Sequence, residues 1–334
     1  MSLQVSVVIP THNPRLDYLR RALEALAAQT LDRSSWDLVV VDNKSEESLE
    51  RELSPALKRM GWATAAQSGV GNARVVREEK LGLTNARLRG FAETTGKVVV
   101  LVDDDNVLSR DYLFQAKTIA REWPQIWAFG GSSIPKFEYP PPEHLRKYLN
   151  VLALRNIERT SWSNSPPCDL AEPWGAGLCL RREAALAYQD YVEREGNFMT
   201  DRVGSELISG GDTEICRLIY RLGHGTGTFP QLSLEHLIPA SRVEEKYLLR
   251  LHQGIQISHH LILSKWDNVK HASAYHPLNI IRLIIRLGKG SLFEKKLALA
   301  RFRGVCLAQE LLRKTKVAKT DQEQNNGSQL KFSR

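Results

Sequence analysis

The stretch Val98-Val99-Val100-Leu101-Val102 runs directly into Asp103-Asp104-Asp105-Asn106. Five consecutive apolar residues, four of them β-branched, predict a buried strand, because the run is too short for a helix. The three carboxylates that follow would repel one another unless a cation lay between them, and oxygen ligands suit a divalent cation. At the carboxyl end of a strand in an α/β sheet, where ligands bind, this predicts a metal site for a substrate that carries phosphate. A solvated acidic turn is the alternative.

The residues around this stretch alternate short apolar strands with amphipathic helices. Strands are predicted at 5–10, 38–41, 73–76 and 98–102, and helices at 17–28, 46–60 and 83–93. Such alternation is typical of right-handed crossovers and of a mostly parallel sheet flanked by helices, so we expect an α/β fold. Pro10, which has no N–H group, is expected to stop the first strand.

Three of these strands end in polar residues. Thr11-His12-Asn13 follows the first, Asp42-Asn43 follows the second, and Asp103 to Asn106 follows the last. Because the carboxyl ends of parallel strands meet at one edge of a sheet, we expect these residues to lie together. Such a convergence is what a nucleotide site requires.

Beyond Trp127 the alternation stops. Loops are predicted at 130–133 and 139–142, a helical stretch at 143–159, a small-residue turn entering a strand at 174–180, and a helix at 212–222. After Pro239 the chain is predicted to be helical. We expect a main domain at 1–238, a basic helical region at 239–318 and a polar, disordered tail at 319–334.

Length and composition are those of a globular protein, with 334 residues, 42% hydrophobic and 25% charged. No apolar run approaches the roughly 18 residues that span a bilayer, and the N-terminus lacks the pattern of a secretory signal. Metal-ligand and disulfide spacings are missing among the four cysteines, Cys168, Cys179, Cys216 and Cys306. These features predict a reducing, cytoplasmic location.

The net charge of +8 is concentrated in one segment. Residues 280–319 contain eleven Lys and Arg but two Glu, a net charge of +9, so the rest of the chain is close to neutral. A basic amphipathic helix can lie on an anionic membrane surface. The alternative is a helical appendage packed on the main domain. Nucleic acid is a poor candidate partner, because the segment has few aromatic residues and no recognised binding module.

Several stretches, in this order along the chain, resemble the family 2 glycosyltransferases of the GT-A fold. They are 6–13 (Ser-Val-Val-Ile-Pro-Thr-His-Asn), 39–45 (Val-Val-Val-Asp-Asn-Lys-Ser), Asp103-Asp104-Asp105, 174–182 (Trp-Gly-Ala-Gly-Leu-Cys-Leu-Arg-Arg) and 211–214 (Gly-Asp-Thr-Glu). The resemblance implies a Rossmann-like catalytic domain at 1–238 with the basic helices as a C-terminal extension. Residues 1–106 would be its nucleotide-binding half and 107–238 its acceptor-binding half.

For the donor, the resemblance implies that Pro10, Thr11 and Asn13 shape the loop under the base. Asp42 would accept a hydrogen bond from a base N–H, with turn chemistry as the alternative. Arg87 matches a family arginine on a helix near the nucleotide, although the family usually has asparagine at the next position, where this chain has leucine. A solvated helix residue is the alternative for Arg87.

The three carboxylates resemble the Asp-x-Asp metal motif of the family. Asp105 would hold the ion, Asp103 would contact the ribose or the metal through water, and Asp104 would lie with the donor. His236 is the candidate further ligand, although a histidine beside leucines is often structural. Mg²⁺ or Mn²⁺ is expected, since carboxylate oxygens suit these ions and no Cys/His cluster for zinc is present.

Asp212 lies in the segment that resembles the motif of the catalytic base, and it would take the proton from an acceptor hydroxyl. The family motif commonly has Glu before this Asp, where this chain has Gly211. Trp174 and Gly175 would contact the acceptor, with Glu214 assisting. The structural alternatives are a helix cap for Asp212, a favourable helix-dipole position for Glu214 and a buried core position for Trp174.

Together these features predict an inverting, metal-dependent glycosyltransferase of the hexosyltransferase type. Its donor would be a nucleotide-diphosphate sugar, with UDP favoured, and its acceptor a glycan or lipid-linked glycan in bacterial polysaccharide or surface-glycan synthesis. We expect it in the cytoplasm, with the inner membrane face as the candidate surface for its basic helices. One alternative is a sugar nucleotidyltransferase, although the Gly-rich phosphate loop that such an enzyme needs is missing after the first strand. The other is a non-catalytic nucleotide- or glycan-binding protein of the same fold.

Overall fold

The computed structural model describes residues 3–62, 72–196, 201–202, 207–267, 269 and 272–329, with side chains as far as residue 314. These residues form two compact units. The first comprises the chain up to Glu244 without residues 207–210, and the second comprises 207–210 and the chain from Glu245. The division follows Glu244, whereas we expected it after residue 238. The additional residues include the 3₁₀ helix η3 (Ala240–Val243), which contributes an arginine to the site described below.

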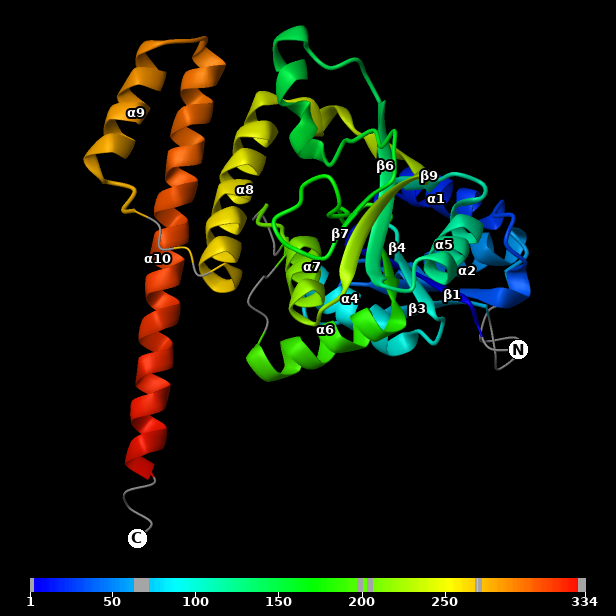
Figure 1. Cartoon of the computed structure of the whole chain (residues 1–334). Coiled ribbons are helices and arrows are strands. Elements are labelled where there is room, and N and C mark those ends of the chain that lie inside the picture. Colours follow the sequence, from blue (N-terminus) through cyan, green and yellow to red (C-terminus); the bar gives the residue numbers. More distant parts are fainter. Residues whose placement is uncertain are drawn as a thin grey trace. The chain divides into compact units, whose positions relative to one another are not determined.

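The N-terminal half of the first unit is a parallel sheet with helices on its faces (Figure 1). Its strands are β1 (Val5–Thr11), β2 (Trp36–Asp42), β3 (Ala73–Arg77) and β4 (Val98–Leu101). The connecting helices are η1 (Arg33–Ser35), α1 (Leu16–Ala27), α2 (Leu49–Arg59) and α4 (Leu83–Glu93). The strands and helices predicted for this half are confirmed. β1 continues through Pro10, however, because its pairing with β4 ends at Val8 and the missing N–H falls beyond that ladder.

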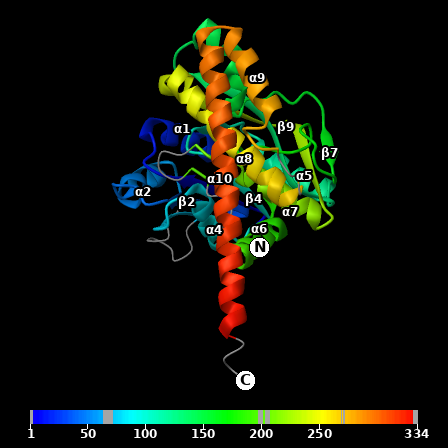
Figure 2. The ribbon, with the colours of Figure 1, turned by 90° about the vertical axis from the view of Figure 1, so that its left-hand side faces the viewer.

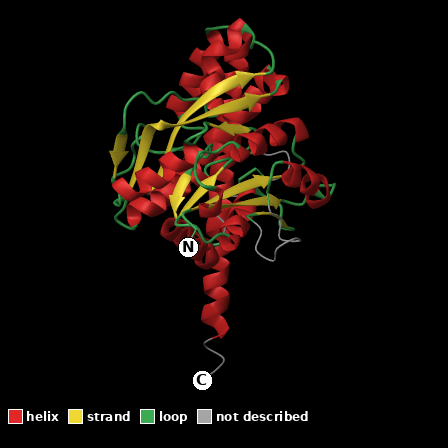
Figure 3. Cartoon of the chain, turned by 90° about the vertical axis from the view of Figure 1, so that its right-hand side faces the viewer, coloured by secondary structure: helices red, strands yellow, loops and turns green. Residues whose placement is uncertain are grey.

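The second half of the first unit adds strands of both directions. They are β5 (Asn106–Leu108), β6 (Ile126–Phe137), β7 (Ser161–Ser163), β8 (Cys179–Arg181) and β9 (Gly225–Ile238). β8 pairs antiparallel with β4 and β6, whereas the long strands β6 and β9 run parallel (Figure 3). The sheet order over the described strands is β3-β2-β1-β4-β8-β6-β9-β5, with β7 paired to β9. The α/β class is confirmed, and the sheet is mixed beyond β4.

A glycine pair that we expected to lie in a loop belongs to β6 instead. Gly130 and Gly131 lie where the pairing of β6 with β9 shifts register. A Cβ on Gly131 would collide with the backbone carbonyl of Leu232 in β9. Glycine therefore permits a close approach of the two strands, which a sequence pattern does not distinguish from a turn.

The helices of this half are α5 (Tyr112–Glu122), η2 (Glu143–Leu152), α6 (Arg182–Glu195) and α7 (Gly211–Arg221). We predicted a helical stretch from 143 to 159, but η2 is a 3₁₀ helix that ends at Leu152. Ala153 then takes a left-handed conformation (φ 58°), and Arg155 pairs with Ser133 of β6. The chain after Leu152 therefore pairs with β6 through Arg155 and does not form the last turns of the predicted helix.

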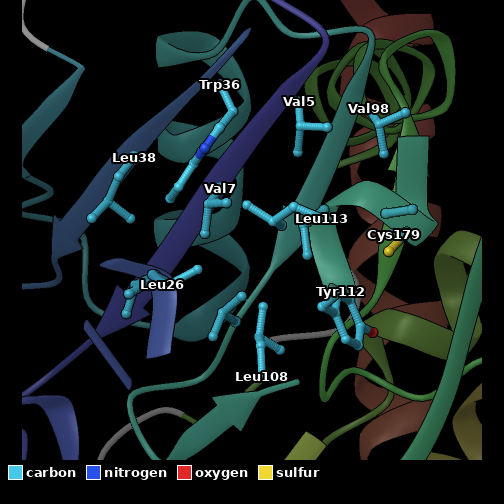
Figure 4. Close-up of a cluster of buried hydrophobic side chains, with 14 of the residues drawn as sticks. Val5, Val7, Leu26, Trp36, Leu38, Val98, Leu108, Tyr112, Leu113 and Cys179 are labelled. Atoms are coloured by element: carbon cyan, nitrogen blue, oxygen red, sulfur yellow. The ribbon is translucent and has the colours of Figure 1, made fainter. Parts of the chain in front are cut away.

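The main core of the first unit lies between one face of the sheet and the helices α1, α2 and α5. Alternate residues of β1, among them Val5 and Val7, face this core together with Trp36 of β2 (Figure 4). Cys179 of β8 is buried here as a free cysteine. Since full burial of a large apolar side chain contributes about 1.5–3 kcal/mol, this core fixes the strand ends that carry the site.

The second unit is built from α8 (Glu245–Trp266), α9 (Pro277–Gly288) and α10 (Leu292–Gln329). α9 and α10 lie side by side (Figure 2), and Tyr275 before α9 meets the ring of Phe302 in α10 edge-on. α8 also packs closely on α10, because a Cβ on Gly304 would lie 2.7 Å from the carbonyl oxygen of Gln253. Within the described residues, no helix combines the length and the apolar character needed to cross a membrane.

α10 extends to Gln329 and so includes most of the segment 319–334 that we expected to be disordered. Extending an existing helix by one residue costs far less than nucleating a new one. Gln and Lys, which recur in this segment, also have high helix propensity. Polar composition alone therefore did not reveal that the helix continues. Residues 330–334 lie outside the described residues.

Candidate active site

The ends of β1, β2 and β4 are joined by hydrogen bonds. The Thr11 hydroxyl at the end of β1 donates to the carboxylate of Asp104, just beyond β4. The backbone N–H of Asn13 donates to the hydroxyl of Ser45 (2.9 Å). The Asn13 side-chain oxygen accepts from the N–H of Glu46 (2.9 Å). The predicted convergence of the three strand ends is confirmed, and Thr11 and Asn13 help to shape this edge.

Asp42 ends β2 with a buried carboxylate that already has two partners. Its Oδ1 accepts from the N–H of Ser45 (2.8 Å), and its Oδ2 accepts from the guanidinium of Arg77 (2.9 Å). The turn chemistry that we gave as the alternative for Asp42 is therefore present. Because each carboxylate oxygen has a second lone pair, a hydrogen bond from a nucleotide base stays a prediction.

Asn43 orders the chain between β3 and α4. Its side-chain oxygen accepts from the N–H of Gly82 (2.8 Å), and its side-chain nitrogen donates to the carbonyl of Lys80 (2.9 Å). The segment that precedes α4 is thus attached to the end of β2.

Burial is the largest influence on the pKa of each of the three carboxylates after β4. It raises the pKa of Asp103, and the neighbouring Asp105 raises it further. Burial also raises the pKa of Asp104 to about 7. For Asp105 burial acts in the same direction, but the hydrogen bonds and charges of His236 and Arg242 outweigh it and hold its pKa below the usual range. Asp103 and Asp104 are therefore short of positive charge.

Asp105 is held from two sides. Its Oδ1 accepts from the side chain of Asn106 (2.9 Å), and its Oδ2 accepts from the guanidinium of Arg242 (2.7 Å). The Nε2 atom of His236 lies 3.5 Å from the same Oδ2. His236 reaches this point because β9 pairs antiparallel with β5, which sets it opposite Asn106. The structure therefore brings His236 and Arg242 to Asp105, and a role of His236 as a metal ligand stays a prediction.

The donor atoms of this cluster fit Mg²⁺ or Mn²⁺ by their chemistry. The carboxylates of Asp103 and Asp105 are hard oxygen ligands. The buried Nδ1 atom of His236 has no hydrogen-bond partner among the described residues. Within those residues, however, no three His, Cys, Asp or Glu side chains are grouped so that they could hold an ion. Because Arg242 donates a hydrogen bond to Oδ2 of Asp105, an ion at that oxygen would require Arg242 to move.

Arg87 lies on the buried side of α4. Gly90, three residues later, allows α4 to pack on β1, because a Cβ there would collide with Val8. The Nη1 atom of Arg87 is 3.4 Å from Oδ2 of Asp201. Burial raises the pKa of Asp103, and Arg87 is the cation that most opposes this rise. Arg87 is thus within electrostatic range of the carboxylates after β4, and its contact with the donor stays a prediction.

Asp212 lies in the first turn of α7, one residue inside the helix and not at its cap. Its Oδ2 accepts from the N–H of Gly175 (2.8 Å), and its Oδ1 accepts from the N–H of Thr213 (2.8 Å). A Cβ on Gly175 would lie 3.0 Å from Nη2 of Arg87 and 3.5 Å from Oδ2 of Asp212. The predicted base, Gly175 and Arg87 therefore meet at one point, and glycine leaves the space between them open.

Trp174 is partly exposed, and one face of its indole ring is occupied. The guanidinium of Arg155 lies 4.5 Å from the ring centroid. Arg155 is fixed by a hydrogen bond to the carbonyl of Glu172 (2.8 Å). The core alternative for Trp174 does not hold, and its contact with an acceptor sugar stays a prediction.

The position of Glu214 differs from our expectation of an acceptor contact. Its side chain is buried and accepts a hydrogen bond from the hydroxyl of Tyr188 in α6 (3.1 Å). Residues two apart on a helix lie about 200° apart around its axis. Because Asp212 faces Gly175, Glu214 points to the opposite side of α7, into the interior.

Three charged residues at the site were not predicted. Arg77 ends β3, so it could have been found by extending the argument about strand ends to the weakest predicted strand. Asp201 and Arg242 lie outside the periodic segments, and no signal in the sequence marks them.

Comparison with known proteins shows what the chain is similar to. Residues 6–162 match the family model described as glycosyl transferase family 2. The glucosyl-dolichyl phosphate glucuronosyltransferase of Haloferax volcanii is 22% identical over 223 residues, which are 65% of this chain and 64% of that protein. Glycosyltransferase AglE of the same organism is 24% identical over 216 residues, 62% of this chain and 58% of that protein. The match thus spans less than two thirds of either relative.

Among solved structures, S. aureus TarS 1–349 has a similar fold. It has a TM-score of 0.50 and 13% identity, over 94% of this chain and 92% of that one. The same TarS fragment in complex with UDP-GlcNAc has a TM-score of 0.51 and the same identity and coverage. At this identity the likeness concerns the fold alone. The match of residues 6–162 to the family model and the two curated relatives show that this part of the chain is similar to glycosyl transferase family 2, and the likeness to TarS shows a GT-A fold.

Proposed function

We propose that the chain is an inverting glycosyltransferase that moves a sugar from a nucleotide-diphosphate donor to a hydroxyl group of a glycan or lipid-linked acceptor. The observation that carries this proposal is the setting of Asp212. Its carboxylate is held by the N–H of Gly175 and lies beside Arg87, in the unit that also contains the carboxylates after β4. A relative named as a glucosyl-dolichyl phosphate glucuronosyltransferase supports a lipid-linked acceptor. The TarS complex with UDP-GlcNAc supports a UDP-sugar donor.

In this proposal Asp212 is the general base. It removes the proton of the acceptor hydroxyl while that oxygen attacks the anomeric carbon, opposite the departing diphosphate, so the configuration inverts. One hydrogen bond from Gly175 to Oδ2 and one from Thr213 to Oδ1 fix the carboxylate while each oxygen keeps a lone pair. Arg87 adds positive charge beside it.

The donor would lie along the edge formed by Thr11, Asn13 and Asp42, with its diphosphate at Asp103 and Asp105. Mg²⁺ or Mn²⁺ at these carboxylates, with His236 as a further ligand, would neutralise the charge that builds on the departing diphosphate. The raised pKa of Asp103, caused by burial and by Asp105, supports a need for added positive charge at this point.

Calorimetric titration with UDP, GDP and dTDP, in Mn²⁺ and then in EDTA, tests the donor site. We expect the chain to bind UDP in Mn²⁺, and we expect EDTA or the substitution Asp105→Ala to weaken this binding at least tenfold. Glu235→Ala is the control, because Glu235 neighbours His236 on β9 but is exposed. If the chain bound none of the three nucleotides, the proposal would be contradicted.

The second unit would bring the enzyme to its lipid-linked acceptor. None of the residues of α9 is buried, and four of its apolar residues, Leu278, Ile281, Ile284 and Ile285, are between 51% and 61% exposed. Arg282 and Arg286 on the same helix are exposed as well. An exposed apolar stripe beside basic residues suits an anionic membrane surface, into which such a helix inserts in parallel orientation.

Flotation with anionic phosphatidylglycerol vesicles at low salt tests this part of the proposal. Ile281→Ser with Ile285→Ser should lower vesicle binding at least tenfold, since burial of each isoleucine contributes about 1.5–3 kcal/mol when complete. Leu186→Ser, at an exposed leucine of α6, is the matched control and should bind as the wild type does. A wild-type chain that stays unbound at low salt would overturn the membrane contact.

A further inference from the structure

The residue before Asp212 departs from the family motif. The structure shows which group occupies the space where the motif's side chain would lie. Gly211 stands where the motif commonly has a glutamate. A Cβ on Gly211 would lie 2.5 Å from Oδ2 of Asp201 and 3.2 Å from Nη1 of Arg87. The same Oδ2 accepts a hydrogen bond from the N–H of Gly211 (3.0 Å). The carboxylate of Asp201 therefore occupies the space into which a side chain at position 211 would extend.

Asp201 is a buried carboxylate whose one described ion-pair partner is Arg87. Nη1 of Arg87 lies 3.4 Å from Oδ2 of Asp201, and both side chains are at least 94% buried. Oδ1 of Asp201 and Nε of Arg87 are buried without a hydrogen-bond partner among the described residues. Burial and, to a lesser extent, the charge of Asp212 raise the pKa of Asp201 to about 6, against the effect of Arg87. A carboxylate at this point carries a desolvation cost, and Gly211 and Arg87 offset part of it.

We propose that Asp201 supplies, from another segment of the chain, the carboxylate that the family motif places at position 211, and that it is a positioning residue for the catalytic base. It holds Arg87 through Nη1, while Nη2 of Arg87 and Oδ2 of Asp212 lie 3.0 Å and 3.5 Å from the point that a Cβ on Gly175 would occupy. Asp201 thus acts on the base through Arg87. This inference rests on the proposed function, because it assumes that Asp212 is the base.

The test is to move the carboxylate from position 201 to position 211. Asp201→Ala should lower kcat roughly a hundredfold while the KM for the donor stays within about threefold, since a positioning residue affects the reacting geometry. Gly211→Glu alone should also lower kcat, because its side chain collides with Asp201. The double variant Asp201→Ala/Gly211→Glu should recover kcat to within about tenfold of the wild type. Turnover is followed as UDP release from UDP-GlcNAc or UDP-glucose.

Asp190→Ala is the control, since Asp190 is an exposed aspartate of α6; it should leave kcat unchanged. Wild-type kcat in Asp201→Ala, or a folded double variant no more active than Asp201→Ala, would overturn the inference. A second measurement needs no substrate. The substitution Gly211→Glu should lower the Tm clearly more when it is made in the wild type than when it is made in the Asp201→Ala variant. Equal decreases of the Tm in the two proteins would overturn the placement of Asp201. A wild type without turnover would instead contradict the proposed function.

Discussion

Replacing Arg242 by glutamine should destabilise the first unit. The guanidinium of Arg242 lies 2.7 Å from Oδ2 of Asp105, which is 7% exposed, while Arg242 is 29% exposed. Removing one partner of a buried ion pair costs about 3–5 kcal/mol, because the other charge is left uncompensated. Since Arg242 is partly exposed and His236 stays beside Asp105, we expect a loss of about 2 kcal/mol. At ~2–4 °C per kcal/mol for a unit of this size, the Tm in EDTA should fall by about 4–8 °C.

The same substitution should strengthen the response to metal, because Oδ2 of Asp105 is then open to a cation. A ligand at a hundred times its Kd stabilises the folded state by ~2.7 kcal/mol, which exceeds the expected loss, so saturating Mn²⁺ should restore the lost Tm. The wild type should respond less, since Mn²⁺ there has to displace Arg242.

Differential scanning calorimetry in EDTA and with increasing Mn²⁺ measures both effects. Arg21→Gln is the matched control, because it removes an exposed ion pair to Glu235 on β9 (3.8 Å) that contributes about 0–1 kcal/mol. An unchanged Tm of Arg242→Gln in EDTA would refute the stabilising pair. Equal responses of the variant and the wild type to Mn²⁺ would refute the competition at Asp105.

Two further predictions concern other parts of the molecule. Gly175→Ala should lower kcat for UDP release roughly tenfold to a hundredfold without loss of UDP binding, because the new Cβ forces Arg87 away from Asp212; wild-type kcat would contradict this. In the second unit, burial and then Arg301 lower the pKa of His252 to about 4, whereas histidine in an unfolded chain titrates near ~6.5. Between these values the unfolded state binds the extra proton, so stability to urea should fall as the pH drops from about 6.5 to about 4. His252→Gln should lack that fall, and an identical pH dependence would contradict the assignment.

The N-terminal half of the site could be predicted because its signals are local. A buried strand, a polar strand end and an amphipathic helix each occupy a few consecutive residues, and parallel topology brings the strand ends together. Thr11, Asp42 and Asp103 were found in this way. The pairing of β6 with β9 was not predicted, because Gly130 and Gly131 have the composition of a turn and their role depends on a strand about a hundred residues away.

The charged partners at the site could not be predicted for the same reason. Arg242 and Asp201 lie in segments without periodicity, and they reach Asp105 and Arg87 through tertiary contacts. For Glu214, closeness in the sequence was misleading. It lies two residues from Asp212, but the turn of the helix directs it into the interior.

The measurement that tests the account most directly compares Asp212→Asn with the wild type in sugar transfer and in UDP binding. The substitution keeps the size of the side chain but removes its ability to take a proton. We expect transfer to fall roughly 10²–10⁴-fold, while UDP affinity stays within a few fold, and Asp190→Asn should change neither. Transfer at the wild-type rate by Asp212→Asn would contradict the assignment of the base and, with it, the proposed mechanism.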